Sequence, residues 1–317
     1  MTDTQNEVFK TPVNKIRLFE HGAPGSQNLK LTRKYYTEDM PDGRVKHIVQ
    51  NITDPDIVPY IPDGIGNSTD RQRIPAVLII PGGAFRRLVY NFEGEDVAKW
   101  LNSMGIAAFV LECRLPSDEH DNAEDVPLID AMRAMRVIRG RAQEFGIDEA
   151  KIGVMGFSEG GFMAALLSTA YESDVYADYK YKDEYDKLSA RPDFAVCSYP
   201  VISIDDCIEA GKRYMSEEQV LERISDSKAK ILHKYNPDKL VRPDMPPVFI
   251  CETDDDRTTL SENSVGFYMA ARKAGVSAEL HIFRTGGHGY GCGDDFAQTG
   301  EWKVLFTKWI KSIGIIS

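Results

Sequence analysis

The chain has 317 residues, 42% of them hydrophobic, which is enough for one large α/β domain or two small ones. Its formal net charge of −11 argues against nucleic acid or an anionic membrane as the main partner. Five widely spaced cysteines form no Cys-x-x-Cys pair, and residues 1–7 lack the features of a signal peptide, so we expect a reduced, cytoplasmic protein without a membrane span.

The first part of the chain predicts an antiparallel edge. Residues 1–40 are poorly periodic and are expected to form an N-terminal extension. Residues 44–50 alternate between polar and apolar side chains, as a half-buried strand does. Residues 52–60 are the candidate antiparallel partner of that strand, and the polar residues 62–73 predict a loop.

From residue 75 onward, apolar segments alternate with helical ones, which is typical of a mostly parallel sheet with helices on both faces. The predicted strands are residues 75–80, 106–111, 151–155, 194–199, 247–251 and 278–283. The predicted helices are residues 96–104, 127–145, 162–167, 217–224, 227–235, 261–274 and 300–313. Residues 170–190 and 203–245 are polar, so we expect loops or cap-like insertions there. No repeat or linker divides the chain, which predicts a single domain over residues 1–317.

The most informative motif is Gly-Phe-Ser-Glu-Gly at residues 156–160, which lies between a predicted strand and a predicted helix. This is the setting that a nucleophile elbow requires, because glycines allow the sharp turn that exposes the central Ser158 hydroxyl. The amide of Glu159 then lies at the positive end of the helix, beside the same hydroxyl. The motif is short, however, and an ordinary glycine-rich turn is the alternative for these five residues alone.

A second glycine loop follows the strand predicted at residues 75–80. Gly82 and Gly83 would allow backbone N–H groups to face a developing oxyanion, together with the Glu159 amide and with Ala84 as a further candidate. A simple strand-to-helix turn is the alternative. No phosphate-binding glycine motif and no metal-ligand cluster occurs, so neither a metal nor an organic cofactor is expected.

A nucleophilic serine needs a base and an acid, which in this type of sheet follow later strands in the order Ser, Asp/Glu, His. His288 alone among six histidines lies between glycines after a predicted strand, and we interpret it as the base. The acidic run at residues 254–256 follows another strand, but the run by itself does not indicate which carboxylate pairs with His288. A plain acidic loop is the alternative, and its spacing is not that of an EF-hand calcium site.

With these motifs, residues 50–315 resemble the α/β-hydrolases, and within them the acetyl-xylan-esterase-like and feruloyl-esterase-like carbohydrate esterases. The most specific stretch runs from Asp130 through the Gly-Ile-Asp turn at 146–148 to the elbow. Residues 81–85 are similar to the family's oxyanion loop, although they replace its His-Gly-Gly-Gly form with Pro-Gly-Gly-Ala. The resemblance selects Asp256 as the acid, with Asp255 as the fallback, because the family's acid precedes a helix-opening serine by eight residues.

The resemblance implies a serine carboxylesterase that removes small acyl groups, most simply acetyl, from sugars or oligosaccharides through an acyl-enzyme. Its partner would be that small-molecule or oligosaccharide ester, and a homo-oligomer is compatible with the sequence. A serine peptidase-like hydrolase has the same fold and triad, but no appended domain that would bind a peptide is visible. A catalytically silent binding protein on this fold is the second alternative, although the serine, acid and histidine in the correct order argue against it.

Overall fold

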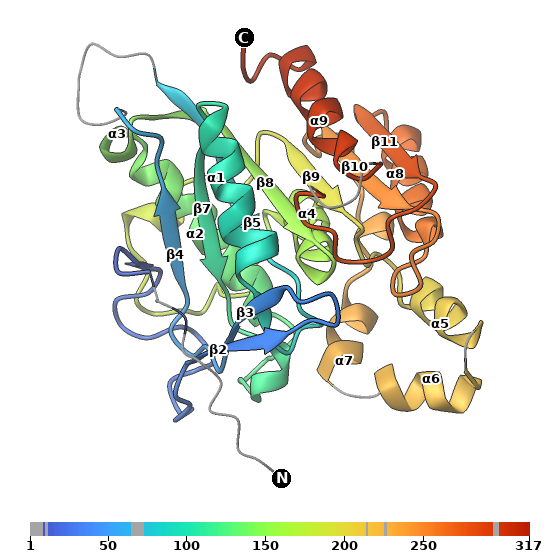
Figure 1. Ribbon diagram of the computed structural model, residues 1–317. Helices are drawn as coiled ribbons and strands as arrows, with labels where there is room; N and C mark the ends of the chain where they lie inside the picture. The colour runs from blue at the N-terminus through green and yellow to red at the C-terminus, as the bar shows by residue number, and fades with distance from the viewer. Residues whose placement is uncertain (1–8, 10–11, 65–72, 214, 225–226, 294–297) are drawn as a thin grey trace.

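The computed structural model describes residues 9, 12–64, 73–213, 215–224, 227–293 and 298–317, and in these residues eight strands form a central sheet (Figure 1). The strand order in that sheet is β1-β4-β7-β5-β8-β9-β10-β11. Its strands are β1 (Ile16–Arg17), β4 (Asp56–Tyr60), β5 (Ile74–Ile80), β7 (Ala107–Glu112), β8 (Ile147–Phe157), β9 (Ala195–Ser198), β10 (Val248–Thr253) and β11 (Ala278–Phe283). All neighbouring pairs from β7 to β11 are parallel, whereas β1 and β4 add an antiparallel edge. The predicted mostly parallel sheet is therefore confirmed.

Helices cover both faces of this sheet. Figure 1 shows α1 and α9 in front of the strands and α2 and α4 behind them. On the front face, Trp100 of α1 packs edge-on against Trp302 of α9, with ring centroids 4.9 Å apart. The helices are α1 (Asp96–Ser103), α2 (Val126–Gly140), α3 (Ala142–Phe145), α4 (Glu159–Ala170), α5 (Ile204–Lys212), α6 (Glu217–Ile224), α7 (Ser227–Lys234), α8 (Ser261–Lys273) and α9 (Glu301–Ser312). Short turns of helix are η1 (Asn91–Glu95), η2 (Pro116–Asp118), η3 (Glu184–Lys187) and η4 (Pro237–Lys239).

The pairing predicted for the N-terminal strands is wrong. The strand predicted at 44–50, β3 (Val45–Gln50), pairs with β2 (Lys34–Asp39) and β6 (Leu88–Val89) in a separate antiparallel sheet. Residues 56–60 instead form β4, which lies between β1 and β7 in the central sheet. Alternation of side chains predicts that a strand forms but not which strand it meets, because the partner is selected by packing of distant segments. The expected extension over residues 1–40 accordingly contributes two strands of its own.

The helix predicted over residues 127–145 is divided in two. The chain leaves helical geometry at Arg141 (φ −103°, ψ 17°), between α2 and α3. Directly before it, Gly140 lacks a side chain, and a Cβ there would lie 2.3 Å from the ring of Tyr185. Glycine is a poor helix former, so this close packing and the weak helix propensity coincide at the break.

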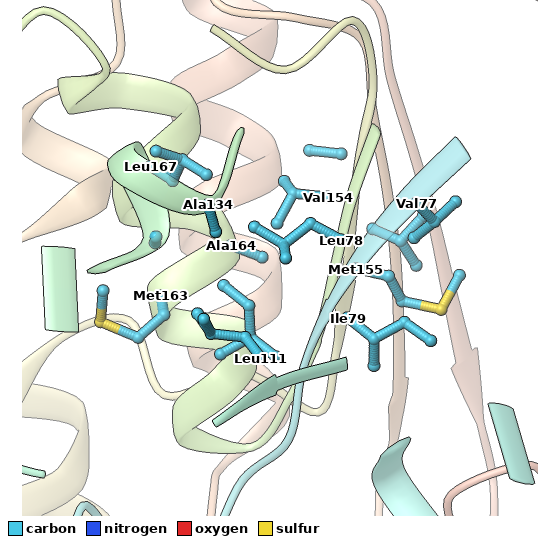
Figure 2. Close-up of a cluster of buried hydrophobic side chains, with 14 of the residues drawn as sticks. Val77, Leu78, Ile79, Leu111, Ala134, Val154, Met155, Met163, Ala164 and Leu167 are labelled. Carbon is cyan, nitrogen blue, oxygen red and sulfur yellow. The ribbon is translucent and has the colours of Figure 1, made fainter. Parts of the chain in front are cut away.

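One layer of the hydrophobic core lies on each face of the sheet at β5 and β8, the strand that leads into the elbow. Along β5 and β8, alternate side chains point to opposite faces, so Leu78 and Val154 face the helix behind the sheet (Figure 2). On that face they meet Ala164 and Leu167 of α4, and all four are fully buried. Because both faces are covered, these strands consist of nearly continuous apolar residues, as the sequence predicted.

The two polar segments predicted as loops or insertions, residues 170–190 and 203–245, differ in structure. The segment 170–190 is mostly irregular, but Arg133 of α2 anchors it by ion pairs with Asp183 and Asp186, and the ring of Tyr176 is buried. The segment 203–245 forms α5, α6, α7 and η4, which confirms the helices predicted at residues 217–224 and 227–235. That these segments form a cap stays a prediction. Of the predicted loop at 62–73, residues 65–72 lie outside the described residues.

Candidate active site

Ser158 lies in the turn between the end of β8 and the first residue of α4, as the motif predicts. Its backbone has φ 56° and ψ −119°, a region that residues with side chains rarely adopt. The turn is tight enough to require glycine on both sides. A Cβ at Gly156 would lie 1.8 Å from the Gly160 carbonyl oxygen, and a Cβ at Gly160 would lie 1.9 Å from that of Ile80.

The structure brings the three predicted side chains together. The Ser158 Oγ lies 2.8 Å from the His288 Nε2, and the His288 Nδ1 lies 2.6 Å from the Asp256 Oδ2. These distances allow one hydrogen bond between the serine hydroxyl and the imidazole and another between the imidazole and the carboxylate. The Ser158 and Asp256 side chains are buried, whereas His288 is partly exposed. Residues that are up to 130 positions apart therefore meet at the carboxyl ends of three parallel strands.

The geometry separates the two candidate acids that the sequence leaves open. Asp256 contacts the imidazole, and its Oδ1 accepts hydrogen bonds from the amides of Thr258 and Thr259 at 2.7 and 2.9 Å. Asp255 points elsewhere: its Oδ1 accepts hydrogen bonds from the amides of Gly286 and Gly287. Asp255 therefore holds the backbone of the histidine loop, while Asp256 orients the ring.

The loop predicted to hold the oxyanion lies beside Ser158, and carboxylates contact both of its glycine amides. Gly82 was predicted as a donor, but its amide donates to the buried Glu93 Oε2 at 2.9 Å. The Gly83 amide donates to the Glu159 Oε2 at 3.1 Å, and the Ser158 hydroxyl donates to the same oxygen at 2.9 Å. The loop also packs closely against Ser158, since a Cβ at Gly82 would lie 2.8 Å from the Ser158 Cβ.

Opposing effects set the pKa of the imidazole. Burial lowers the pKa of His288, but the hydrogen bond and charge of Asp256, followed by the charges of Glu159 and Glu93, raise it above the ordinary value. The reciprocal holds for Asp256. Burial raises its pKa, yet the hydrogen bond and charge of His288 bring it below the usual range. Both shifts therefore favour the charged form of the group concerned.

Sequence reasoning missed two residues beside the imidazole, Glu93 of η1 and Tyr199. The Tyr199 ring lies edge-on to the His288 ring with centroids 5.1 Å apart, and its hydroxyl donates to the Glu93 Oε1 at 2.9 Å. Burial raises the pKa of Glu93. Glu93 belongs to a π-helical turn whose path has no local sequence signal, so only the structure could place it here.

A pocket of about 240 Å³ opens onto Ser158 and His288. One wall comes from the hairpin of β2 and β3, which contributes Arg44 and Lys46, and another comes from the loop that carries Arg87. Across the described part of the chain, no three His, Cys, Asp or Glu side chains are arranged to hold a metal ion. None of the described helices has the length and apolarity needed to cross a membrane.

Comparisons with known proteins agree with this fold. The BD-FAE family model matches residues 65–270, a range that contains Ser158 and Asp256. A protein of Xylanibacter ruminicola named acetylxylan esterase is 30% identical over 240 residues, which is 75% of this chain and 45% of that protein. The chain thus spans less than half the length of that curated relative.

Solved structures match over nearly the whole chain. An acetyl ester-xyloside bifunctional hydrolase from Caldicellulosiruptor lactoaceticus is 35% identical, with a TM-score of 0.71, and the match covers 96% of this chain and 97% of that one. The carboxylesterase Cest-2923 from Lactobacillus plantarum shares the fold at 20% identity, with a TM-score of 0.67 and coverage of 90% and 99%.

The sheet order, the elbow and these structural relatives define an α/β-hydrolase. Within that fold, the match over 65–270 spans well over half of the chain. The chain belongs to the BD-FAE family.

Proposed function

We propose that the chain is a serine carboxylesterase that hydrolyses small acyl esters, acetyl esters foremost, of sugars or oligosaccharides. One observation carries the proposal: the Ser158 Oγ lies 2.8 Å from the His288 Nε2, while the Asp256 Oδ2 lies 2.6 Å from the other ring nitrogen. A hydroxyl, an imidazole and a carboxylate connected in this way are the groups that activate a serine for acyl transfer.

The reaction then runs in two steps. The Ser158 Oγ attacks the ester carbonyl while His288 takes its proton, and the resulting intermediate expels the sugar alcohol, which receives that proton. A water molecule, deprotonated by His288, next attacks the acyl-serine, and the carboxylic acid and free Ser158 result. Asp256 keeps the imidazole in the required orientation and stabilises its positive charge.

The oxyanion donors in this proposal are the amides of Gly83 and Glu159. Glu159 directly follows Ser158 in the chain, and Gly83 lines the same pocket as Ser158. One such donor is typically worth roughly 3–4 kcal/mol of transition-state stabilisation. Gly82, whose amide donates to Glu93, supports the proposal in a different way: its lack of a side chain leaves room for Ser158. No step of this mechanism requires a metal or an organic cofactor.

The names of the relatives support the substrate class. The relative from Xylanibacter ruminicola is named acetylxylan esterase, and the structure from Caldicellulosiruptor lactoaceticus is described as an acetyl ester-xyloside bifunctional hydrolase. The first name refers to an acetyl ester of a polysaccharide and the second to acetyl esters and xylosides, so both are compatible with the sugar ester that we propose. A cytoplasmic location and a homo-oligomer stay predictions.

The test is hydrolysis of p-nitrophenyl acetate and of acetylated xylo-oligosaccharides by the wild-type chain and by Ser158→Ala. We expect the variant to fold, because it removes one oxygen, and to lose more than about 10³-fold in kcat. A fluorophosphonate probe should label the wild-type chain at Ser158 and leave the variant unlabelled. Undiminished turnover by the variant would rule out the mechanism, and absence of labelling and turnover in the wild-type chain would favour a silent binding protein.

A further inference from the structure

The backbone amide and the side chain of Glu159 both lie at the active site. Its amide is an oxyanion donor in the proposed mechanism, whereas its side chain lies over the nucleophile. The Glu159 Oε2 accepts a hydrogen bond from the Ser158 hydroxyl at 2.9 Å and another from the Gly83 amide at 3.1 Å. Glu159 as a whole residue is 5% exposed, and it lines the pocket that opens onto Ser158. A carboxylate oxygen therefore lies within hydrogen-bond distance of both the attacking atom and a proposed donor.

That position is the one a substrate oxygen needs. During acyl transfer, the carbonyl oxygen lies about 3 Å from the backbone donors, and its carbon lies next to the serine oxygen. Two oxygens cannot share the position, and a carboxylate there resembles the acid product of ester hydrolysis. Building on the proposed esterase function, we propose that the Glu159 carboxylate occupies the oxyanion site of the free enzyme and must turn away before an ester can bind.

The contact with Glu159 also affects the protonation of His288. Ser158 Oγ has one proton and lies 2.9 Å from the Glu159 Oε2 and 2.8 Å from the His288 Nε2. When the hydroxyl donates to Glu159, it cannot donate to the imidazole, so His288 Nε2 must carry a proton and donate instead. Nδ1 already faces the Asp256 carboxylate. The closed arrangement therefore favours an imidazolium, which cannot act as the base.

The charges around the imidazole favour the same state. Glu159 from α4, Glu93 from η1 and Asp256 from the loop after β10 are the carboxylates that raise the pKa of His288, against the lowering by burial. Tyr199 packs against the ring from the end of β9. The positive charges that line the same pocket belong to Arg44, Lys46 and Arg87. Arg44 and Arg87 already pair with Asp42 and Glu38, so these cations are held on the walls of the pocket and leave the carboxylates around the imidazole in place.

Two kinetic properties should therefore depend on Glu159. Substrate must displace the side chain, so the KM includes the free energy of opening, and the kcat of the open complex does not. If the open state is populated to about 10%, removal of the side chain should lower the KM about tenfold. Loss of the negative charge should also move the acid limb of the kcat/KM profile to lower pH, because a neutral His288 persists there.

The experiment compares Glu159→Ala, which removes the carboxylate and keeps the backbone amide, with Glu159→Gln, which keeps the size and an oxygen acceptor. The control is Glu144→Gln, the same chemical change at an exposed glutamate on α3 that pairs with Arg141. For p-nitrophenyl acetate we expect Glu159→Ala to lower the KM, to shift the acid limb to lower pH and to strengthen inhibition by acetate. Glu159→Gln should shift the limb similarly with a smaller change in KM, and Glu144→Gln should match the wild-type chain.

Thermal unfolding of each variant is measured first. If Glu159→Ala does not fold, the acid limb of the kcat/KM profile of the isosteric Glu159→Gln variant decides the test. An unchanged acid limb in the folded variants, or a KM that rises in Glu159→Ala, would overturn the proposal. Such results would leave the esterase function in place as long as Ser158→Ala is inactive. An active Ser158→Ala variant would instead contradict the proposed function itself.

Discussion

At the scale of single residues, the site concentrates strain and charge at a few positions. Ser158 has a positive φ that only the flanking glycines and the packing of β8 against α4 can maintain. Around its hydroxyl, one imidazole lies among the charges of three carboxylates, those of Asp256, Glu159 and Glu93. In the free enzyme each carboxylate accepts hydrogen bonds from backbone amides or hydroxyl groups, so none of the three is left without a partner.

The assignment of Asp256 can be tested against its neighbour. Asp256→Asn removes the charge that orients and stabilises the His288 ring, and we expect kcat to fall about 10³- to 10⁴-fold, as in other triads. The pKa of His288 should also fall, since the hydrogen bond and charge of Asp256 are the main effects that raise it. The measurement is the pH profile of kcat for p-nitrophenyl acetate hydrolysis.

Asp255→Asn is the matched control for that measurement. It weakens the hydrogen bonds to the amides of Gly286 and Gly287 but leaves the contact between Asp256 and the imidazole intact. We expect a much smaller loss of kcat. If Asp255→Asn were the more damaging of the two substitutions, the roles assigned to the two aspartates would have to be exchanged.

At the scale of elements, α4 depends on its close approach to the neighbouring strand. A methyl group at Gly160 would lie 1.9 Å from the Ile80 carbonyl oxygen, which is a backbone atom that cannot rotate away. We expect Gly160→Ala to lower the free energy of unfolding by about 1–3 kcal/mol through overpacking. Activity should fall as well, because the start of α4 carries the Glu159 amide. Urea unfolding and kcat/KM are the measurements.

Gly266→Ala is the matched control on α8. Gly266 lies in the helix interior and is exposed, and a Cβ there would meet nothing within 4 Å. Because alanine loses less backbone entropy than glycine on helix formation, this variant should gain up to about 1 kcal/mol of stability. Equal effects at positions 160 and 266 would contradict the packing argument for α4.

At the scale of the whole molecule, the N-terminal segment is fastened to the body by a buried polar cluster. Arg114 and Asp130 form a fully buried ion pair at 2.7 Å, and Arg114 also donates to the Ser26 hydroxyl and to the carbonyl of Pro24. Ser26 in turn contacts the Nδ1 of His120 at 3.1 Å. The segment before β2 therefore folds with the rest of the chain, and its stability depends on groups that can titrate.

His120 should make stability depend on pH. Burial, with a contribution from the charge of Arg114, lowers the pKa of His120 to about 4, against about 6.5 in the unfolded chain. Between these pH values, the unfolded state binds one proton more. The stabilisation is thus fully present above about pH 6.5 and is lost as the pH falls to about 4, for a maximum near 3 kcal/mol.

The measurement is the free energy of unfolding from urea titrations between pH 4 and 7, for the wild-type chain and for His120→Gln. Burial raises the pKa of Asp118 to about 6, which has the opposite effect on stability, so only the difference between the two chains is informative. We expect the stability of the wild-type chain relative to the variant to fall as the pH decreases from about 6.5 to about 4. Parallel curves would show that His120 is not responsible.

The sequence by itself determined the features that depend on local spacing and local composition. The glycines around Ser158 predict the elbow because only they permit so tight a turn, and the apolar runs of β5 and β8 predict a sheet covered on both faces. His288 could be singled out because its glycine loop directly follows a strand. Parallel strands bring such loops to one edge, so the meeting of serine, acid and histidine followed from the order of the elements.

The tertiary structure alone decided what depends on contacts between distant segments. The alternation of residues 44–50 predicted the strand β3, but the sequence placed β3 beside residues 52–60, which is wrong. A strand pattern is compatible with several partners until the core has packed. Only the fold shows that Asp256 and not Asp255 meets the imidazole, and that Glu93 and the Glu159 side chain contact the glycine amides. Adjacent residues differ little in sequence pattern, but the direction of their side chains depends on the surrounding backbone, which no local signal specifies.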